Sequence, residues 1–293
     1  IDLRVAAGEV FGLLGANGAG KTTTIRMLCG TLAPDAGEMR VAGVDMVRHP
    51  RRARGRIGYV SQGFALYGDL TVRENLSLQA GLYGLGGDAA RGRIGRALDY
   101  LSLRAHASRP ARGLPMGFQR RLSLACALLH EPAVLFLDEP TSGVDPLARQ
   151  HFWELIYDLA EGGIGILVTT HYMDEAAFCD RLALMHDGRV IEQGAPEELL
   201  HRRLSTPMIE LEAARCESCA RWLSDSREVR EVIPHAGRLR IRLQAGADAE
   251  AFMDEARRRA REQGTAVSRI EPVAPELEDV FVALIEQAEE AAH

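Results

Sequence analysis

The chain has 293 residues, of which 46% are hydrophobic, 26% are charged and 5% are aromatic. This composition excludes a disordered, collagen-like or purely coiled-coil protein, and the length suffices for one large domain and a smaller one. The formal net charge of -6 gives no general attraction to nucleic acid or anionic lipid. No segment approaches the roughly 18 apolar residues of a membrane span, so any membrane role is expected to pass through a partner.

The cysteines do not predict a disulfide framework, and their number and spacing fit a reducing compartment. They are Cys29, Cys126, Cys179, Cys216 and Cys219. The last two form a single Cys-x-x-Cys without the second pair or histidine cluster of a zinc site, so we interpret them as structural. Because the first residue is isoleucine, we expect the sequence to begin inside a longer gene product.

The first candidate site follows an apolar run at residues 10–14, which predicts a buried strand. Next comes the phosphate-loop pattern Gly15-Ala16-Asn17-Gly18-Ala19-Gly20-Lys21-Thr22. Its glycines allow backbone N–H groups to surround phosphate oxygens, and a helix beginning at Lys21 adds the positive end of its dipole. Lys21, the only lysine, would reach the β and γ phosphates of a nucleotide, and the Thr22 hydroxyl would ligate Mg²⁺. The expected nucleotide-binding residues are Gly15, Asn17, Gly18, Ala19, Gly20, Lys21, Thr22 and Thr23.

Two further apolar runs end in polar residues that complete this site. The run at 134–137 ends in Asp138, expected to hold Mg²⁺, and Glu139, expected to polarise the attacking water. The run at 164–168 leads through two threonines to His171. An isolated histidine is more often structural, but at the carboxyl end of a parallel strand His171 is a candidate γ-phosphate sensor.

The order of these motifs resembles the ATP-binding subunit of ABC transporters over about residues 1 to 200. The resemblance implies that Gln62 is the Q-loop glutamine, which touches Mg²⁺ and links to the membrane subunit. It also implies that Asp138 and Glu139 are the Walker B pair, that Asp145 is the D-loop aspartate and that His171 is the switch histidine. The segment 64–76 is similar to the segment that follows the Q-loop in the ATPases of ABC-2-type exporters. Within that class, drug and antibiotic efflux systems are the nearest group.

The signature segment departs from the family pattern Leu-Ser-Gly-Gly-Gln. Here it is Leu114-Pro115-Met116-Gly117 followed by Phe118, so the serine hydroxyl and the first glycine are absent. In the family this segment binds the γ-phosphate held by the opposite subunit, so Pro115 and Met116 are expected to weaken that opposite site. This Leu-Pro-x-Gly signature resembles the signature of the second cassette in exporter ATPases that carry two cassettes in tandem.

The expected fold is α/β, with a P-loop ABC ATPase core, a helical subdomain and a small C-terminal α+β module. We place the ATPase domain at residues 1–204, its helical subdomain at about 71–120, and the accessory domain at 205–293. A polar linker is expected at 201–207. After it, the order strand, helix, strand, strand, helix, strand predicts a ferredoxin-like module, and a final amphipathic helix is expected at 276–286.

The resemblance implies an ATPase that uses ATP and Mg²⁺ to power an ABC-2-type exporter of drugs or other small molecules. Its expected partners are a membrane permease and a second ATPase cassette, as a homodimer or tandem partner, at the cytoplasmic face of the inner membrane. The alternative is a soluble ABC ATPase that acts on ribosomes; a small-molecule kinase is disfavoured because it needs no D-loop or signature. The arginine clusters at 51–54 and 257–261 are interpreted as solvated helix faces, and no nucleic acid is expected. The adenine-stacking residue of the family would lie upstream of Ile1.

Overall fold

The computed structural model describes residues 1–63, 65–203, 206–235 and 237–292. The chain separates into two compact units, Ile1–Pro196 and Glu197–His293. The domain boundary expected between residues 204 and 205 lies outside the described residues. The prediction of a polar linker at 201–207 is wrong for residues 201–203, because these residues belong to helix α8 (Pro196–Arg203). The helix begins at a proline and has two glutamates in its first turn, and both features favour a helix start.

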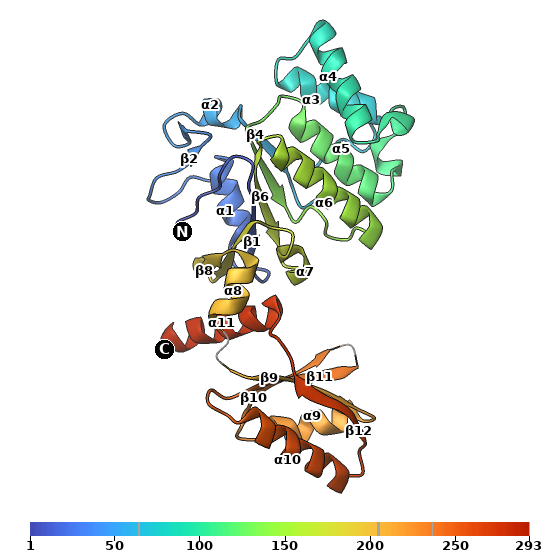
Figure 1. Cartoon of the computed structure of the whole chain (residues 1–293). Helices are drawn as coiled ribbons and strands as arrows, with labels where there is room; N and C mark the ends of the chain where they lie inside the picture. The colour runs from blue at the N-terminus through green and yellow to red at the C-terminus, as the bar shows by residue number, and fades with distance from the viewer. Residues whose placement is uncertain (64, 204–205, 236, 293) are drawn as a thin grey trace. The chain divides into compact units, whose positions relative to one another are not determined.

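A six-stranded sheet forms the centre of the first unit, in the order β4-β5-β6-β1-β7-β8 (Figure 1). The strands are β1 (Val10–Leu14), β4 (Ile57–Val60), β5 (Val134–Asp138), β6 (Gly165–Thr170), β7 (Arg181–His186) and β8 (Arg189–Gly194). All neighbours pair in parallel except β7 and β8. Every residue of β1 and β6 is buried, as expected of parallel strands covered on both faces. Because β6 lies between β5 and β1, the loops that follow these three strands meet at one edge of the sheet.

Helices cover the sheet on both sides. Figure 1 shows α1 (Lys21–Leu28) on one side and α5 (Met116–Leu128) and α6 (Pro146–Glu161) on the other. Shorter elements are the hairpin of β2 (Arg40–Val41) and β3 (Val44–Asp45), and the helices α2 (Pro50–Arg54) and α7 (Met173–Ala176). Apolar side chains of α1, β1 and the hairpin share one buried cluster, which fixes the loop between β1 and α1.

The segment expected as a helical subdomain contains α3 (Val72–Leu82), α4 (Gly87–Tyr100) and two short 3₁₀ helices, Arg104–His106 and Ala111–Gly113. Helix α3 begins with a capping box, in which the Thr71 hydroxyl accepts the N–H of Glu74 and the Glu74 carboxylate accepts the N–H of Thr71. The buried Asn75 amide donates to the carbonyls of Tyr67 and Leu70. These bonds hold the loop before α3 in place.

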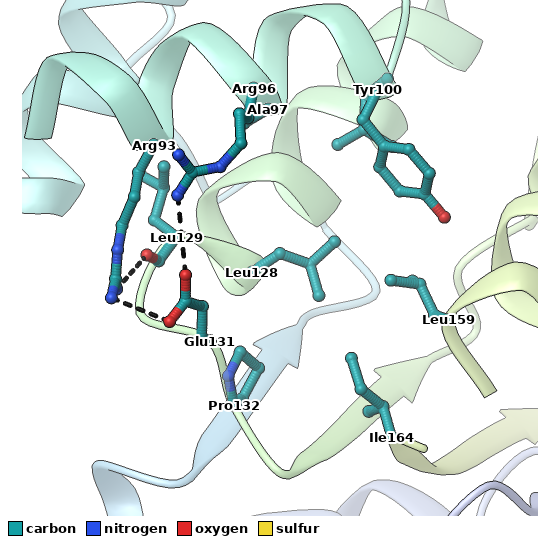
Figure 2. Close-up of a pocket in the computed structure, with 11 residues that line it drawn as sticks. Arg93, Arg96, Ala97, Tyr100, Leu128, Leu129, Glu131, Pro132, Leu159 and Ile164 are labelled. Atoms are coloured by element: carbon teal, nitrogen blue, oxygen red, sulfur yellow. Dashed lines mark hydrogen bonds and ion pairs between the residues drawn. The ribbon is translucent and has the colours of Figure 1, made fainter. Parts of the chain in front are cut away.

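A pocket of about 510 Å³ lies between α4, the end of α5 and the segment before β6 (Figure 2). Its walls are mainly leucine, isoleucine and proline, and its rim carries Arg93, Arg96 and Glu131. The Glu131 carboxylate lies 2.8 Å from Arg93 and 3.7 Å from Arg96. Glu131 has a left-handed backbone with φ of 58°, which is uncommon for a residue other than glycine and marks the turn before β5.

The second unit is an antiparallel four-stranded sheet with helices between its strands. The strands are β9 (Met208–Ala213), β10 (Val229–His235), β11 (Arg238–Leu243) and β12 (Val267–Pro272), in the order β10-β11-β9-β12. Helix α9 (Cys216–Ser224) connects β9 to β10, and α10 (Ala249–Glu262) connects β11 to β12. This order and connectivity confirm the ferredoxin-like prediction. The last helix, α11 (Leu277–Ala292), extends beyond the range expected from its apolar spacing.

Candidate functional site

The phosphate-loop residues lie between β1 and α1, where the sequence placed them. Gly18 and Gly20 have left-handed φ values of 89° and 104°, and Gly20 is the residue before the first turn of α1. A Cβ at Gly20 would lie 2.8 Å from the Met185 methyl group. The left-handed backbone therefore favours glycine at this position, and a Cβ there would also require the end of the Met185 side chain to move.

Lys21 is held at the centre of the loop. Its side chain is 5% exposed, and Nζ donates hydrogen bonds to the carbonyls of Gly15 at 2.7 Å and Ala16 at 3.1 Å. Nζ also lies 3.5 Å from the Glu139 Oε1 atom. The ammonium is thus positioned in a largely dry site, where its attraction to phosphate is stronger than in water.

Two hydroxyls and a carboxylate form the part of the site that suits a divalent cation. The Thr22 hydroxyl donates to Asp138 Oδ1 at 3.2 Å, and the Thr169 hydroxyl donates to the same atom at 2.7 Å. Asp138 is 1% exposed. Carboxylate and hydroxyl oxygens are ligands that Mg²⁺ prefers, so Thr22 and Asp138 fit the metal role expected of them.

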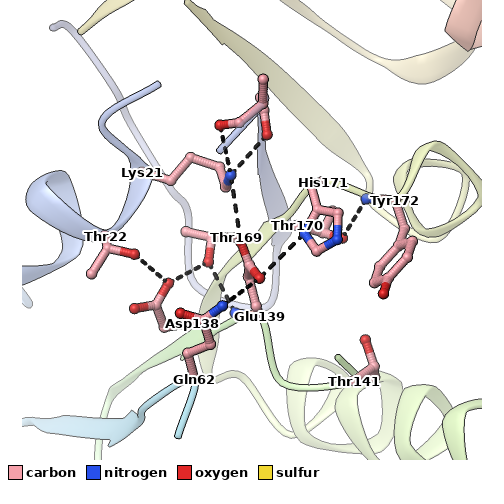
Figure 3. Close-up of polar contacts among 12 residues, drawn as sticks. Lys21, Thr22, Gln62, Asp138, Glu139, Thr141, Thr169, Thr170, His171 and Tyr172 are labelled. Carbon is pink, nitrogen blue, oxygen red and sulfur yellow. Dashed lines mark hydrogen bonds and ion pairs between the residues drawn. The ribbon is translucent and has the colours of Figure 1, made fainter. Parts of the chain in front are cut away.

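Glu139 is the residue on which the other polar groups converge (Figure 3). Its Oε2 atom accepts a hydrogen bond from the Gln62 amide at 2.8 Å and lies 3.2 Å from His171 Nδ1. Its backbone is left-handed, with φ of 45°, and its N–H donates to the carbonyl and the hydroxyl of Thr169 at 3.1 and 3.0 Å. The structure therefore brings Lys21, Gln62 and His171 to one carboxylate from three different loops.

A pocket of about 330 Å³ opens over these groups. Within the described residues it is lined by Asn17, Gly18, Gly20, Lys21, Thr22, Thr23, Gln62 and Glu139. Of the expected nucleotide-binding residues, Ala19 is 5% exposed, and its carbonyl accepts the N–H of Gly188. The phosphate loop and Glu139 thus share one opening in this part of the chain.

The signature and D-loop residues lie beside each other, but they are not among the described residues that line this pocket. Pro115 precedes the first turn of α5, and Met116 is 48% exposed. A Cβ at Gly143 would lie 3.2 Å from the Met116 sulfur. Asp145 caps α6 by accepting the N–H of Ala148 at 3.0 Å. Leu114 is buried, and a Cβ at Gly117 would lie 2.9 Å from the Ala148 Cβ, so glycine permits α5 to approach α6.

Thr169 and Thr170 lie in the site, although the sequence motifs assign them no role. Thr169 binds both Asp138 and the backbone of Glu139. The Thr170 hydroxyl donates to Glu175 at 2.7 Å and accepts the N–H of Tyr172 at 3.0 Å, which fixes the turn that carries His171. Polar β-branched residues at the end of an otherwise apolar buried run are the signal that could have identified them.

Two other ionisable groups near Asp138 stay protonated at neutral pH. Burial, and to a smaller extent the Asp138 charge, raises the pKa of the Cys29 thiol to about 12. Loss of solvation, assisted by Asp138, raises the pKa of the Tyr59 phenol to about 12. Neither group therefore offers a base for water at neutral pH.

The chain is similar to known proteins. The family described as ABC transporter matches residues 1–142. The Nod factor export ATP-binding protein I of Paraburkholderia xenovorans is 44% identical over 212 residues, which are 72% of this chain and 70% of that protein. This chain belongs to the ABC transporter family.

A second relative matches over a smaller share of its own length. The probable multidrug ABC transporter ATP-binding protein YbhF of Escherichia coli K12 is 49% identical over 199 residues, which are 68% of this chain. The matched part is 34% of that protein, so the match spans about a third of its length.

Solved structures agree with the fold. The cbiO1 protein of Clostridium perfringens, part of the ABC transporter complex cbiONQ, is 32% identical with a TM-score of 0.64 over 69% of this chain and 83% of that one. A dimeric ATP-binding cassette bound to ADP and Pi is 26% identical with a TM-score of 0.61, over 67% of this chain and 88% of that one. The first unit of this ABC protein thus has the P-loop ATPase fold that its motifs predicted.

Proposed function

We propose that this chain binds and hydrolyses ATP as the nucleotide-binding subunit of an ABC-2-type exporter. The observation that carries the ATPase part of the proposal is the convergence of Lys21, Gln62 and His171 on the Glu139 carboxylate. In this proposal Lys21 binds phosphate and the Glu139 carboxylate accepts a proton from water. Gln62 and His171 orient that carboxylate. This is the set of groups that phosphoryl transfer to water requires.

Each residue has a distinct task in this proposal. The N–H groups of the phosphate loop and Lys21 hold the β and γ phosphates, and Glu139 takes a proton from the attacking water. Thr22 and Asp138 would hold Mg²⁺, which neutralises developing charge on the phosphates when bound. Gln62 orients Glu139 through its amide, and His171 contacts the same carboxylate from the end of β6.

The assembly and the location are also proposals. Two cassettes are expected to close head to tail, so that the signature residues 114–117 and Asp145 of each cassette meet the phosphate loop of the other. The names of the relatives, multidrug transport and Nod factor export, support an exporter of drugs or other small molecules. In the described parts of the chain no helix is long and apolar enough to cross a membrane. We place the chain at the cytoplasmic face of the cell membrane, bound to a permease.

The test replaces the proposed base. Glu139→Gln keeps the side-chain shape, and its carbonyl oxygen can still accept the Gln62 amide hydrogen. We expect ATP affinity to stay unchanged and turnover to fall about 10²- to 10⁴-fold, because an amide cannot take a proton from water. Phosphate release and titration with fluorescent ATP measure the two quantities, and Glu154→Gln, an exposed residue of α6, is the matched control. Near-normal phosphate release by Glu139→Gln would contradict the proposal.

The same variant separates the exporter from the ribosomal alternative. With hydrolysis blocked, ATP should hold the chain on its working partner. We expect Glu139→Gln to accumulate in the membrane fraction of cells that express the permease. Accumulation on ribosomes, with none on membranes, would favour the alternative.

A further inference from the structure

An arginine segment at residues 46–56 stands out from the rest of this acidic chain. Between Asp45 and Asp69 the sequence has no acidic residue, and the segment contains five arginines. They are Arg48, Arg51, Arg52, Arg54 and Arg56, and all five are exposed. Helix α2 buries Ala53, which is 0% exposed, so it is anchored to the protein while its arginines face solvent.

Several arginines elsewhere in the chain form ion pairs with nearby acids. Figure 2 shows the arrangement on α4, where Arg93 and Arg96 share the carboxylate of Glu131. Ion pairs of the same kind join Arg91 to Asp88, Arg104 to Asp99, Arg112 to Asp69, Arg257 to Asp254 and Arg258 to Glu255.

The arginine segment is different. Across the described residues its one ion pair joins Arg48 to Asp45, at 3.6 Å. The positive charge of the other four arginines is therefore available to an external anion.

An exposed apolar side chain accompanies this charge. Val47 is 59% exposed and directly precedes Arg48. The segment has no phenylalanine, tyrosine or tryptophan on which a nucleic-acid base could stack. Basic side chains around an exposed aliphatic residue suit the headgroup layer of an anionic bilayer, where the charges meet phosphates and the aliphatic group enters the apolar boundary.

We propose that the arginine segment binds anionic phospholipid headgroups of the bilayer surface. The inference rests on the proposed function only in placing the chain beside a membrane. Each arginine near an anionic surface raises the partition coefficient roughly fivefold, so removal of three arginines lowers it roughly 100-fold. The contact adds a second attachment to the membrane besides a permease, and it weakens as salt screens the charges.

Flotation of the full chain with vesicles tests the proposal. One set is pure phosphatidylcholine, and the other contains phosphatidylcholine and phosphatidylglycerol in a three-to-one ratio. We expect binding to the second set alone, and loss of that binding in high salt. The variant R51Q/R52Q/R54Q should bind roughly 100-fold more weakly. The control R91Q/R96Q/R258Q removes the same charge from exposed, ion-paired arginines and should bind like the parent.

Several outcomes would overturn the proposal. They are absence of binding to the phosphatidylglycerol vesicles, an equal loss in the two triple variants, displacement by millimolar inorganic phosphate, or preference for an RNA oligonucleotide over the vesicles. Titration with fluorescent ATP on the same samples separates this proposal from the proposed function. Failure of vesicle binding with intact ATP binding rejects the lipid contact and leaves the ATPase proposal standing.

Discussion

Replacement of Lys21 by alanine tests the phosphate-binding role most directly. In the structure Nζ makes two hydrogen bonds to loop carbonyls, at 2.7 and 3.1 Å, and these acceptors can be exchanged for two phosphate oxygens. A hydrogen bond to a charged group contributes about 1.5–3 kcal/mol, so loss of two contacts costs about 3–6 kcal/mol. At 1.4 kcal/mol for each factor of ten, the dissociation constant for ATP should rise about 10²- to 10⁴-fold.

Titration with fluorescent ATP measures this loss, and thermal unfolding shows whether the variant remains folded. The parent chain offers a second measurement, because Lys21 is its only lysine. Acylation with an amine-selective reagent can modify only Lys21 and the chain's terminal amine. We expect ATP to slow the labelling of Lys21 and to leave the labelling of the terminal amine unchanged. Unaltered affinity in a folded Lys21→Ala variant, or labelling of Lys21 that ATP does not slow, would refute the reasoning.

Three other outcomes are expected. Restoring serine at Pro115 together with glycine at Met116 should raise ATP turnover of the chain alone about ten- to a hundredfold, since one charged hydrogen bond to the γ-phosphate is regained; equal rates before and after would contradict the weakened signature. Arg240→Met should lower the free energy of unfolding of the second unit by about 3–5 kcal/mol in urea titration, because it leaves Asp279, 4% exposed, without its ion-pair partner at 2.7 Å; a smaller loss would show that water reaches Asp279. Truncation after Leu204 should keep ATP affinity and change association or transport, and loss of binding in a folded truncation would assign the C-terminal module a direct part in the site.

The sequence predicted the strands around the phosphate loop, and the placement of the polar residues that follow them, where local pattern and chemistry coincide. The apolar runs before Gly15 and Asp138 are long enough to specify buried strands, and the polar residues after them lie at one sheet edge because parallel strands share their direction. The glycines of the phosphate loop are likewise explained locally, as Gly20 shows with its left-handed backbone. Such features depend on neighbouring residues, which is why a single sequence reveals them.

Contacts between residues far apart in the sequence could not be predicted from the spacing of motifs along the chain. The hydrogen bond from Gln62 to Glu139 joins residues 77 positions apart, and only the pairing of β4 with β5 brings them together. The alternation in β11 correctly predicts a strand, yet Arg240 and Arg242 are 5% and 2% exposed. Their burial follows from acidic residues of α11, since Glu286 lies 2.7 Å from Arg242, and no local pattern encodes that partner.

The backbone of Glu139 connects stability with function at this site. A left-handed conformation costs a residue with a Cβ roughly 1–2 kcal/mol, and glycine would avoid that cost. Local hydrogen bonds offset this conformational cost, because both the carbonyl and the hydroxyl of Thr169 accept the Glu139 N–H. The same turn ends β5 directly after Asp138, so one carboxylate stays at Thr22 while the next swings toward Lys21 and Gln62. Two adjacent acids on a regular strand would point to opposite faces of the sheet. The strained turn is therefore what brings the Asp138 and Glu139 carboxylates together beside the phosphate loop.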